Sequence, residues 1–128
     1  MKLLHFKRFD GVGIGLLTDK GILDIKSVGE KFNEGLPDSL DNLIKDEFSL
    51  HKIKELEEKA SNYSALYLRE EDLEFLPIIL KPEKIICVGL NYRKHAIEGG
   101  FEIVEYPVLF NKYNNALAAH KQEIKIPK

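Results

Sequence analysis

Cysteine is almost absent from this chain of 128 residues, since Cys87 is its single example. One thiol excludes a disulfide framework and a cysteine-based zinc cluster within one copy. No apolar run approaches the ~20 residues that a membrane-spanning helix needs. Charge is also nearly balanced, at a net −2 with both signs interspersed, so no basic patch favours nucleic acid. Charges among residues 1–7 come too early for a secretory signal. We therefore expect a cytoplasmic protein without a membrane or nucleic-acid partner.

The composition is that of a folded, globular chain. Apolar residues make up 44% and charged residues 31% of the sequence, which is typical of globular domains. The length suits one domain, or one domain with a small subdomain. Cys87 lies in the most apolar run of the chain, so we expect it to be a buried structural thiol.

The first 26 residues predict a small antiparallel β meander. Residues 2–9 alternate apolar and polar side chains up to Asp10-Gly11, and a second apolar run follows at 12–18. A second tight turn falls at Lys20-Gly21. Asp-Gly between two such runs is a hairpin signal. We expect three strands within residues 2–26.

Residues 27–62 instead predict helices. Ser39 is placed to cap a helix that begins at Leu40. Residues 51–60 are rich in charge, with an apolar stripe at helical spacing; the stripe consists of Ile53, Leu56 and Ala60. We expect helical structure over about 40–60.

Two prolines predict a boundary after the helices. Pro77 and Pro82 bracket Ile78-Ile79-Leu80, and proline forces an extended conformation on the residue before it. We therefore expect an N-terminal α+β subdomain over 1–80 and a second domain that begins within 81–128.

The second part predicts a strand, a short helix and further strands. Residues 84–89 have the composition of a buried strand, and residues 93–98 of a helix that Gly99-Gly100 ends. Later strands are expected at 106–112 and 123–127. We expect a mixed sheet starting at Ile85, and the fold class of the whole chain is α+β.

His95 and Glu98 are the residues that suggest chemistry. They stand three positions apart, so a helix places them on one face. A carboxylate beside a histidine can hold its tautomer and raise its basicity, as general-base catalysis requires. A histidine and a glutamate at this spacing are also common on surface helices, and the spacing alone does not decide between the two readings.

A longer pattern around these residues resembles the fumarylacetoacetate hydrolase family. Residues 85–98 read IICVGLNYRKHAIE, and residues 107–112 read PVLFNK. They match the family's buried strand, G-x-N-Y-x-x-H-x-x-E, gap and P-x-x-F-x-K. The opening residues also look like the family's N-terminal strands. The nearest likeness is to acylpyruvate hydrolases, oxaloacetate decarboxylases and 2-hydroxyhepta-2,4-diene-1,7-dioate isomerases.

The resemblance implies roles for individual residues. His95 and Glu98 would be the catalytic pair that deprotonates water or shuttles a proton. Lys112 would lie near the carboxylate or enolate oxygen of the substrate. Around them, the residues that shape the turn or meet an anionic substrate would be Asn91, Tyr92 and Arg93.

The family's metal ligands have no counterpart in this sequence. Members bind Mg²⁺ or Mn²⁺ through two glutamates in an E-x-E pattern and an aspartate, all after the P-x-x-F-x-K strand. This sequence stops at Lys128 before such a pattern. We expect no metal ligands and no activity in this chain alone. It would be the N-terminal portion of a metal-dependent hydrolase, isomerase or decarboxylase of 2-oxo acids. An inactive binding or assembly module, or a chain that acts with a separate metal-bearing chain, remains open.

Two further expectations follow from the resemblance. Family members are commonly dimers with a closed, mostly β catalytic domain, so we expect a homo-oligomer, with a dimer first. Residues 113–121 lack the glycines of the family's P-x-S-A-L-x-G-x-G segment, so this loop should differ. His120, within it, is either a surface residue or peculiar to this protein.

Overall fold

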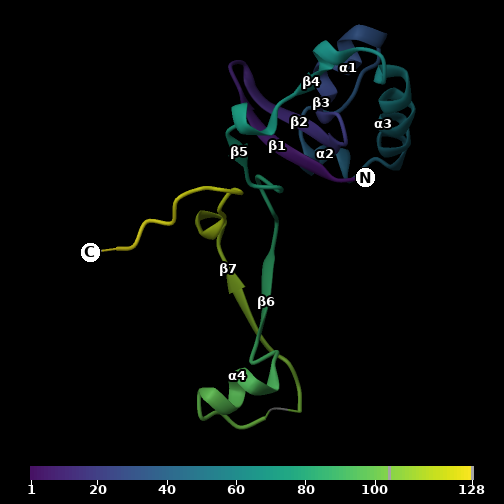
Figure 1. Cartoon of the computed structure of the whole chain (residues 1–128). Coiled ribbons are helices and arrows are strands. Elements are labelled where there is room, and N and C mark those ends of the chain that lie inside the picture. The colour runs from purple at the N-terminus through teal and green to yellow at the C-terminus, as the bar shows by residue number, and fades with distance from the viewer. Residues whose placement is uncertain (104, 128) are drawn as a thin grey trace. The chain divides into compact units, whose positions relative to one another are not determined.

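The computed structural model describes residues 1–103 and 105–127 (Figure 1). The chain forms two compact units. The first comprises Met1–Leu80 together with the segment from Ala118 onward, and the second comprises Lys81–Leu117. The functional division into domains 1–80 and 81–128 stays a prediction.

The first unit is built on the predicted meander, which is confirmed. Strands β1 (Leu3–Arg8), β2 (Gly11–Thr18) and β3 (Gly21–Asp24) pair antiparallel in chain order. Both connections are two-residue loops, because Arg8 pairs with Gly11 and Thr18 with Gly21. Both glycines have positive φ, 134° and 120°, a conformation that glycine takes without a steric cost.

Two very short strands, which the sequence did not predict, complete the sheet. β4 (Tyr67–Leu68) pairs with β3, and β5 (Phe75–Leu76) pairs with β1, so the strand order is β4-β3-β2-β1-β5. The connector around them contains two 3₁₀ turns, at Ser64–Leu66 and Glu70–Asp72. Short edge strands leave little backbone for pairing with another chain.

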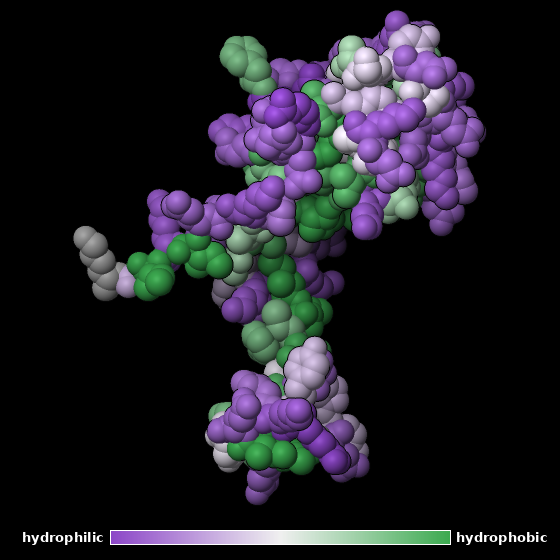
Figure 2. Space-filling view, in the orientation of Figure 1, coloured by the Kyte–Doolittle hydropathy of each residue, from purple (hydrophilic) through white to green (hydrophobic). Residues whose placement is uncertain are grey.

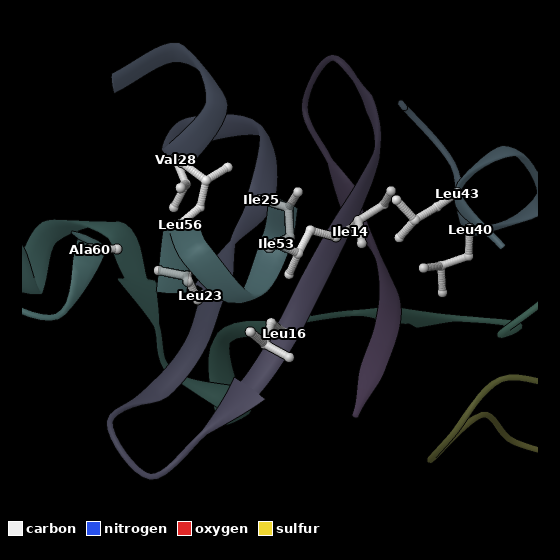
Figure 3. Packing of buried hydrophobic residues seen from close by; sticks show 10 residues of the cluster. All are labelled: Ile14, Leu16, Leu23, Ile25, Val28, Leu40, Leu43, Ile53, Leu56 and Ala60. Atoms are coloured by element: carbon white, nitrogen blue, oxygen red, sulfur yellow. The ribbon is translucent and has the colours of Figure 1, made fainter. Parts of the chain in front are cut away.

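Helices cover one face of this sheet. They are α1 (Ile25–Phe32), α2 (Leu40–Leu43) and α3 (Glu47–Ala60), which confirms the helical region expected over 40–60. Figure 3 shows side chains from β2, β3 and the three helices meeting in one core. The core consists of Ile14, Leu16, Leu23, Ile25, Val28, Leu40, Leu43, Ile53, Leu56 and Ala60. The predicted apolar stripe of α3 is therefore buried.

The helix starts differ in how they are capped. Ser39 occupies the N-cap position of α2, as predicted, but its side chain makes no capping hydrogen bond. Asp46 caps α3, where its carboxylate accepts a hydrogen bond from the Phe48 backbone N–H at 3.1 Å. A capping carboxylate satisfies an amide that has no partner within the helix.

His5 on β1 links three parts of the first unit. Its ring is fully buried. Nε2 accepts a hydrogen bond from the Leu40 backbone N–H at 2.7 Å, and Nδ1 lies 3.2 Å from the Pro77 carbonyl oxygen. Because Nε2 is the acceptor, Nδ1 carries the proton and donates to Pro77. Nearby, the Leu80 N–H donates to the Asp41 carboxylate at 3.0 Å.

The second unit is a two-stranded antiparallel ribbon with a short helix. β6 (Ile85–Gly89) pairs with β7 (Val108–Lys112), and α4 (Arg93–Glu98) lies in the connection between them. A 3₁₀ turn at Asn114–Ala116 follows β7. The strand at 84–89 and the helix at 93–98 are thus confirmed to within a residue, and the later strand is shorter than the expected 106–112.

Three expectations about this part are wrong. The β6–β7 sheet is antiparallel rather than mixed. β6 is not buried, because Ile86 is 64% and Val88 is 46% exposed, and Cys87 is only half-buried. Residues 123–127 form no strand. The alternating pattern there indicates a segment suited to a sheet, but a strand also needs a neighbouring edge.

The fold class is α+β, as predicted: an antiparallel sheet carries helices on one face, and a separate β ribbon carries α4. In the part of the chain that the structure describes, no helix is long and apolar enough to cross a membrane.

Candidate functional site

The proposed site residues gather around α4, immediately after β6. Gly89 forms the last pair of the ribbon, opposite Val108. Leu90 then takes a left-handed conformation, with φ at 50°, and turns the chain. Tyr92 is the N-cap of α4, and its carbonyl accepts from the Ala96 N–H at 3.2 Å. One left-handed residue therefore converts strand into helix within three positions.

The predicted glycine stop of α4 is present. Gly100 has a φ of 68° and donates its N–H to the Ile97 carbonyl at 3.1 Å. Phe101 donates its N–H to the Ala96 carbonyl at 2.9 Å. These two bonds form a Schellman motif, in which a left-handed glycine allows the last carbonyls to be satisfied. Ala96 is the buried residue of α4.

His95 and Glu98 lie one turn apart on α4, as the sequence predicts, and both are exposed. Among the described residues, their side chains form no hydrogen bond or ion pair with each other. Both remain open to a ligand from solvent. A rotamer change on one helix face is enough to bring side chains at this spacing together.

The structure does not bring Lys112 to this helix. Lys112 pairs with Ile85 at one end of the ribbon, whereas Gly89 pairs with Val108 at the end that leads to α4. Four residue steps along a strand separate those ends by about 13 Å. Asn91, Tyr92 and Arg93 adjoin the pair in sequence, and all three are exposed. Their substrate roles and that of Lys112 stay predictions.

The described residues do not fit a Mg²⁺ or Mn²⁺ site. No group of three or more histidine, cysteine, aspartate or glutamate side chains converges in residues 1–103 and 105–127. Mg²⁺ and Mn²⁺ prefer several oxygen ligands at one point. We therefore derive no chemical step through a metal from these residues.

A cluster of four charged side chains lies in the first unit, around the β1–β2 turn. Hydrogen bonds from Lys26 and Arg8 lower the pKa of Asp10 to about 2. Arg8 also pairs with Asp24, whose Oδ2 accepts from Ser27 Oγ at 2.7 Å. Opposite charges here are matched within the cluster, so it holds the hairpin against the start of α1 and offers no unbalanced charge to a ligand.

Leu90 is the residue at this site that the sequence did not reveal. Leucine is not a residue that signals left-handed backbone. Nothing in the composition of this stretch distinguishes Leu90 from the strand before it.

Comparison with models of protein families finds no match. Among curated proteins, the chain is 32% identical over 136 residues to the oxaloacetate tautomerase YisK of Bacillus subtilis, which covers 98% of this chain and 45% of that protein. It is 26% identical over 132 residues to the mitochondrial oxaloacetate tautomerase fahd2 of Xenopus laevis, covering 99% of this chain and 39% of that protein.

A shorter match carries the family's name. Over 48 residues the chain is 42% identical to the fumarylacetoacetate hydrolase domain-containing protein 2 homolog of Dictyostelium discoideum, which covers 38% of this chain and 16% of that protein. The α+β chain is thus related to two proteins named as oxaloacetate tautomerases and to one named for a fumarylacetoacetate hydrolase domain. This result confirms the resemblance found in the sequence, because the curated relatives of this chain are members of the fumarylacetoacetate hydrolase family. The chain spans less than half the length of the relatives it matches.

Proposed function

We propose that this chain supplies the residues that transfer protons in a metal-dependent site for 2-oxo carboxylic acids. The reaction at that site would be hydrolysis, isomerisation or decarboxylation. The observation that carries the proposal is the open His95–Glu98 pair on α4, one helical turn apart. The names of the relatives favour tautomerisation of oxaloacetate within that group of reactions.

Tautomerisation needs only the movement of a proton. The C3 proton of the keto acid leaves, and the C2 carbonyl oxygen gains a proton, so no atom is added or lost. A neutral imidazole at His95 can take the C3 proton and then donate a proton to the C2 oxygen, and the Glu98 carboxylate can stabilise the imidazolium between these two transfers. Lys112, Asn91, Tyr92 and Arg93 remain candidates to contact or shape the substrate.

The catalytic pair can be tested in a chimera. In it, this chain replaces the matching 45% of the Bacillus subtilis oxaloacetate tautomerase and is joined to the remainder of that protein. There, His95→Ala should lower the enol–keto conversion rate of oxaloacetate by ~10²-fold or more, as expected for loss of a general base. Glu98→Gln should lower it less. Lys94→Ala is the matched control on the same helix and should change little. Full activity in both the His95 and Glu98 variants would refute the assignment.

Mg²⁺ or Mn²⁺ is proposed only for the complete enzyme, because the described residues do not fit such a site. Titration calorimetry of the present chain with Mg²⁺ and oxalate, a chelator that resembles an enolate, should show no metal-dependent binding. Micromolar binding of oxalate that requires Mg²⁺ would show that this chain holds a metal site of its own.

A second candidate is an inactive binding or assembly module. The β6–β7 ribbon favours it, because this ribbon exposes large apolar side chains that a partner would cover. Figure 2 shows that hydrophobic residues follow this ribbon. If the chimera folds but never turns over oxaloacetate above background, the second candidate is favoured.

A further inference from the structure

Leu90 adopts a backbone conformation that its residue type avoids. In the described part of the chain, the non-glycine residues with positive φ are Asn33 at 57°, Leu90 at 50° and Lys121 at 63°. Asparagine tolerates the left-handed region because its side chain can hydrogen-bond to nearby backbone. Leucine has no such hydrogen bond to offset the clash between its Cβ and the backbone. Leu90 is therefore a strained residue at the entrance to α4.

The neighbouring glycine makes the strain more informative. Gly89 is not among the glycines with positive φ. A Cβ added to it would lie 3.5 Å from the Val108 carbonyl oxygen, which is ordinary contact. The chain thus has glycine where a side chain fits and leucine where glycine would fit without strain. Strained residues of this kind gather where a particular geometry is needed.

Among the described residues, α4 makes few contacts with the two strands of the second unit. Ala96 is its buried residue, and the helix is joined to β6 only through residues 90–92. Once a residue with a Cβ is held in the left-handed well, its φ and ψ are confined to a narrow range. Glycine would leave the same position free to visit both signs of φ.

We propose that Leu90 is a positioning residue: its confined left-handed backbone sets the direction in which α4 presents His95 and Glu98. The relevance of that direction to catalysis rests on the proposed function. The confinement itself does not, because it is a property of the β6–α4 connection.

The test is heteronuclear NMR on the 128-residue chain, with residual dipolar couplings and order parameters for the amides of α4, β6 and β7. Leu90→Gly should leave the β6 and β7 values unchanged. The α4 order parameters should fall from the rigid range near ~0.85 toward ~0.6, and the couplings should shrink. Leu90→Asn keeps a Cβ and tolerates the left-handed region, so it should preserve the wild-type α4 values.

Gly89→Ala is the matched control, because it adds a Cβ where space exists, and it should change neither set of values. Unchanged α4 couplings in Leu90→Gly would overturn the proposal, since other contacts would then fix the helix. Equal loss in the Gly and Asn variants would also overturn it, because the side chain of leucine rather than its confined backbone would be responsible. Neither result depends on activity, so the proposed function stands or falls separately by the His95 variants.

Discussion

At the scale of single residues, the buried His5 side chain connects segments of the first unit that are far apart in the sequence. It is fully buried, and both ring nitrogens contact backbone groups from distant segments, at Leu40 and Pro77. Buried polar groups are stable only while they stay paired. One ring therefore holds β1, the start of α2 and the end of the connector together.

Replacement of His5 by alanine should destabilise the protein. The change leaves the Leu40 N–H buried without its acceptor, and an unsatisfied buried group costs about 1–3 kcal/mol. Chemical denaturation should show a lower midpoint. His51→Ala is the control, since His51 is exposed on α3, and a surface substitution should change stability by less than about 0.5 kcal/mol. Equal midpoints for the two variants would contradict the role given to His5.

Asp10 should make part of the stability dependent on acid. Lys26 and Arg8 lower its pKa to about 2 from an ordinary value of 3.8. A carboxylate with a lowered folded-state pKa stabilises the fold above its unfolded-state pKa and stops doing so as pH falls through the folded value. Its contribution should be present above about pH 4 and disappear toward pH 2.

The measurement is the unfolding free energy of wild type and Asp10→Asn at a series of pH values. The variant should be less stable than wild type at neutral pH, and the difference should vanish as pH approaches 2. A difference that stays constant over that range would show that the Asp10 ion pairs do not stabilise the fold.

At the scale of elements, the sequence predicted those helices and strands whose bounds are set by residues close to them in the chain. It did not predict the strands that depend on pairing with distant residues. The β1–β3 meander and the stop of α4 follow from glycines in tight turns, and both were predicted. β4 and β5 are two residues each and exist because β3 and β1 offer them edges. Such pairing has no local signal. The burial of β6 was overestimated for the same reason. An apolar run shows that a strand is suited to a buried position, but it does not show whether another element covers the strand.

The end of α1 gives a sharp test of packing between elements. Gly29 lies in the last turn of α1, where the Glu34 N–H donates to its carbonyl at 2.8 Å. A Cβ on Gly29 would lie only 2.7 Å from the Glu34 carbonyl oxygen, a backbone atom that cannot swing away. Gly29→Ala should therefore cost about 1–3 kcal/mol, as overpacking does.

Gly35→Ala is the matched control for Gly29. It lies in the loop just after α1, and a Cβ there would meet nothing within 4 Å. Thermal unfolding should show a clear loss of melting temperature for Gly29→Ala and little change for Gly35→Ala. A gain in stability from both variants would mean that the α1 turn relaxes more easily than its geometry indicates.

At the scale of the whole molecule, the two units differ in how much apolar surface they cover. The first has a closed core, whereas the second exposes much of its β ribbon. The exposed residues there include Ile86, Val88, Leu109 and Phe110. The ribbon also has two strand edges without a neighbour among the described residues. A two-stranded ribbon alone is marginally stable in water.

We expect the chain to self-associate, with a dimer as the first species. Light scattering over a wide concentration range should show a mass above that of one chain. Ile86→Lys together with Leu109→Lys should lower it, because charge on an exposed strand opposes pairing. Glu47→Lys, on the exposed surface of α3, is the control for charge alone. A monomer at every concentration would exclude self-association.

The segment that begins at Ala118 returns to the first unit. His120 packs edge-on against the Phe75 ring with centroids 5.2 Å apart, and the Lys121 ammonium lies 2.9 Å from a Glu70 carboxylate oxygen. The chain therefore leaves the first unit after Leu80, shortly after β5. When it returns at Ala118, it contacts Phe75 of β5 and the nearby Glu70. Residues on both sides of the second unit, Leu80 and Ala118, therefore belong to the same compact first unit. Both chain ends of the second unit are thus held by one folded body, so a change in the length of residues 81–117 has to leave these two attachment points in place.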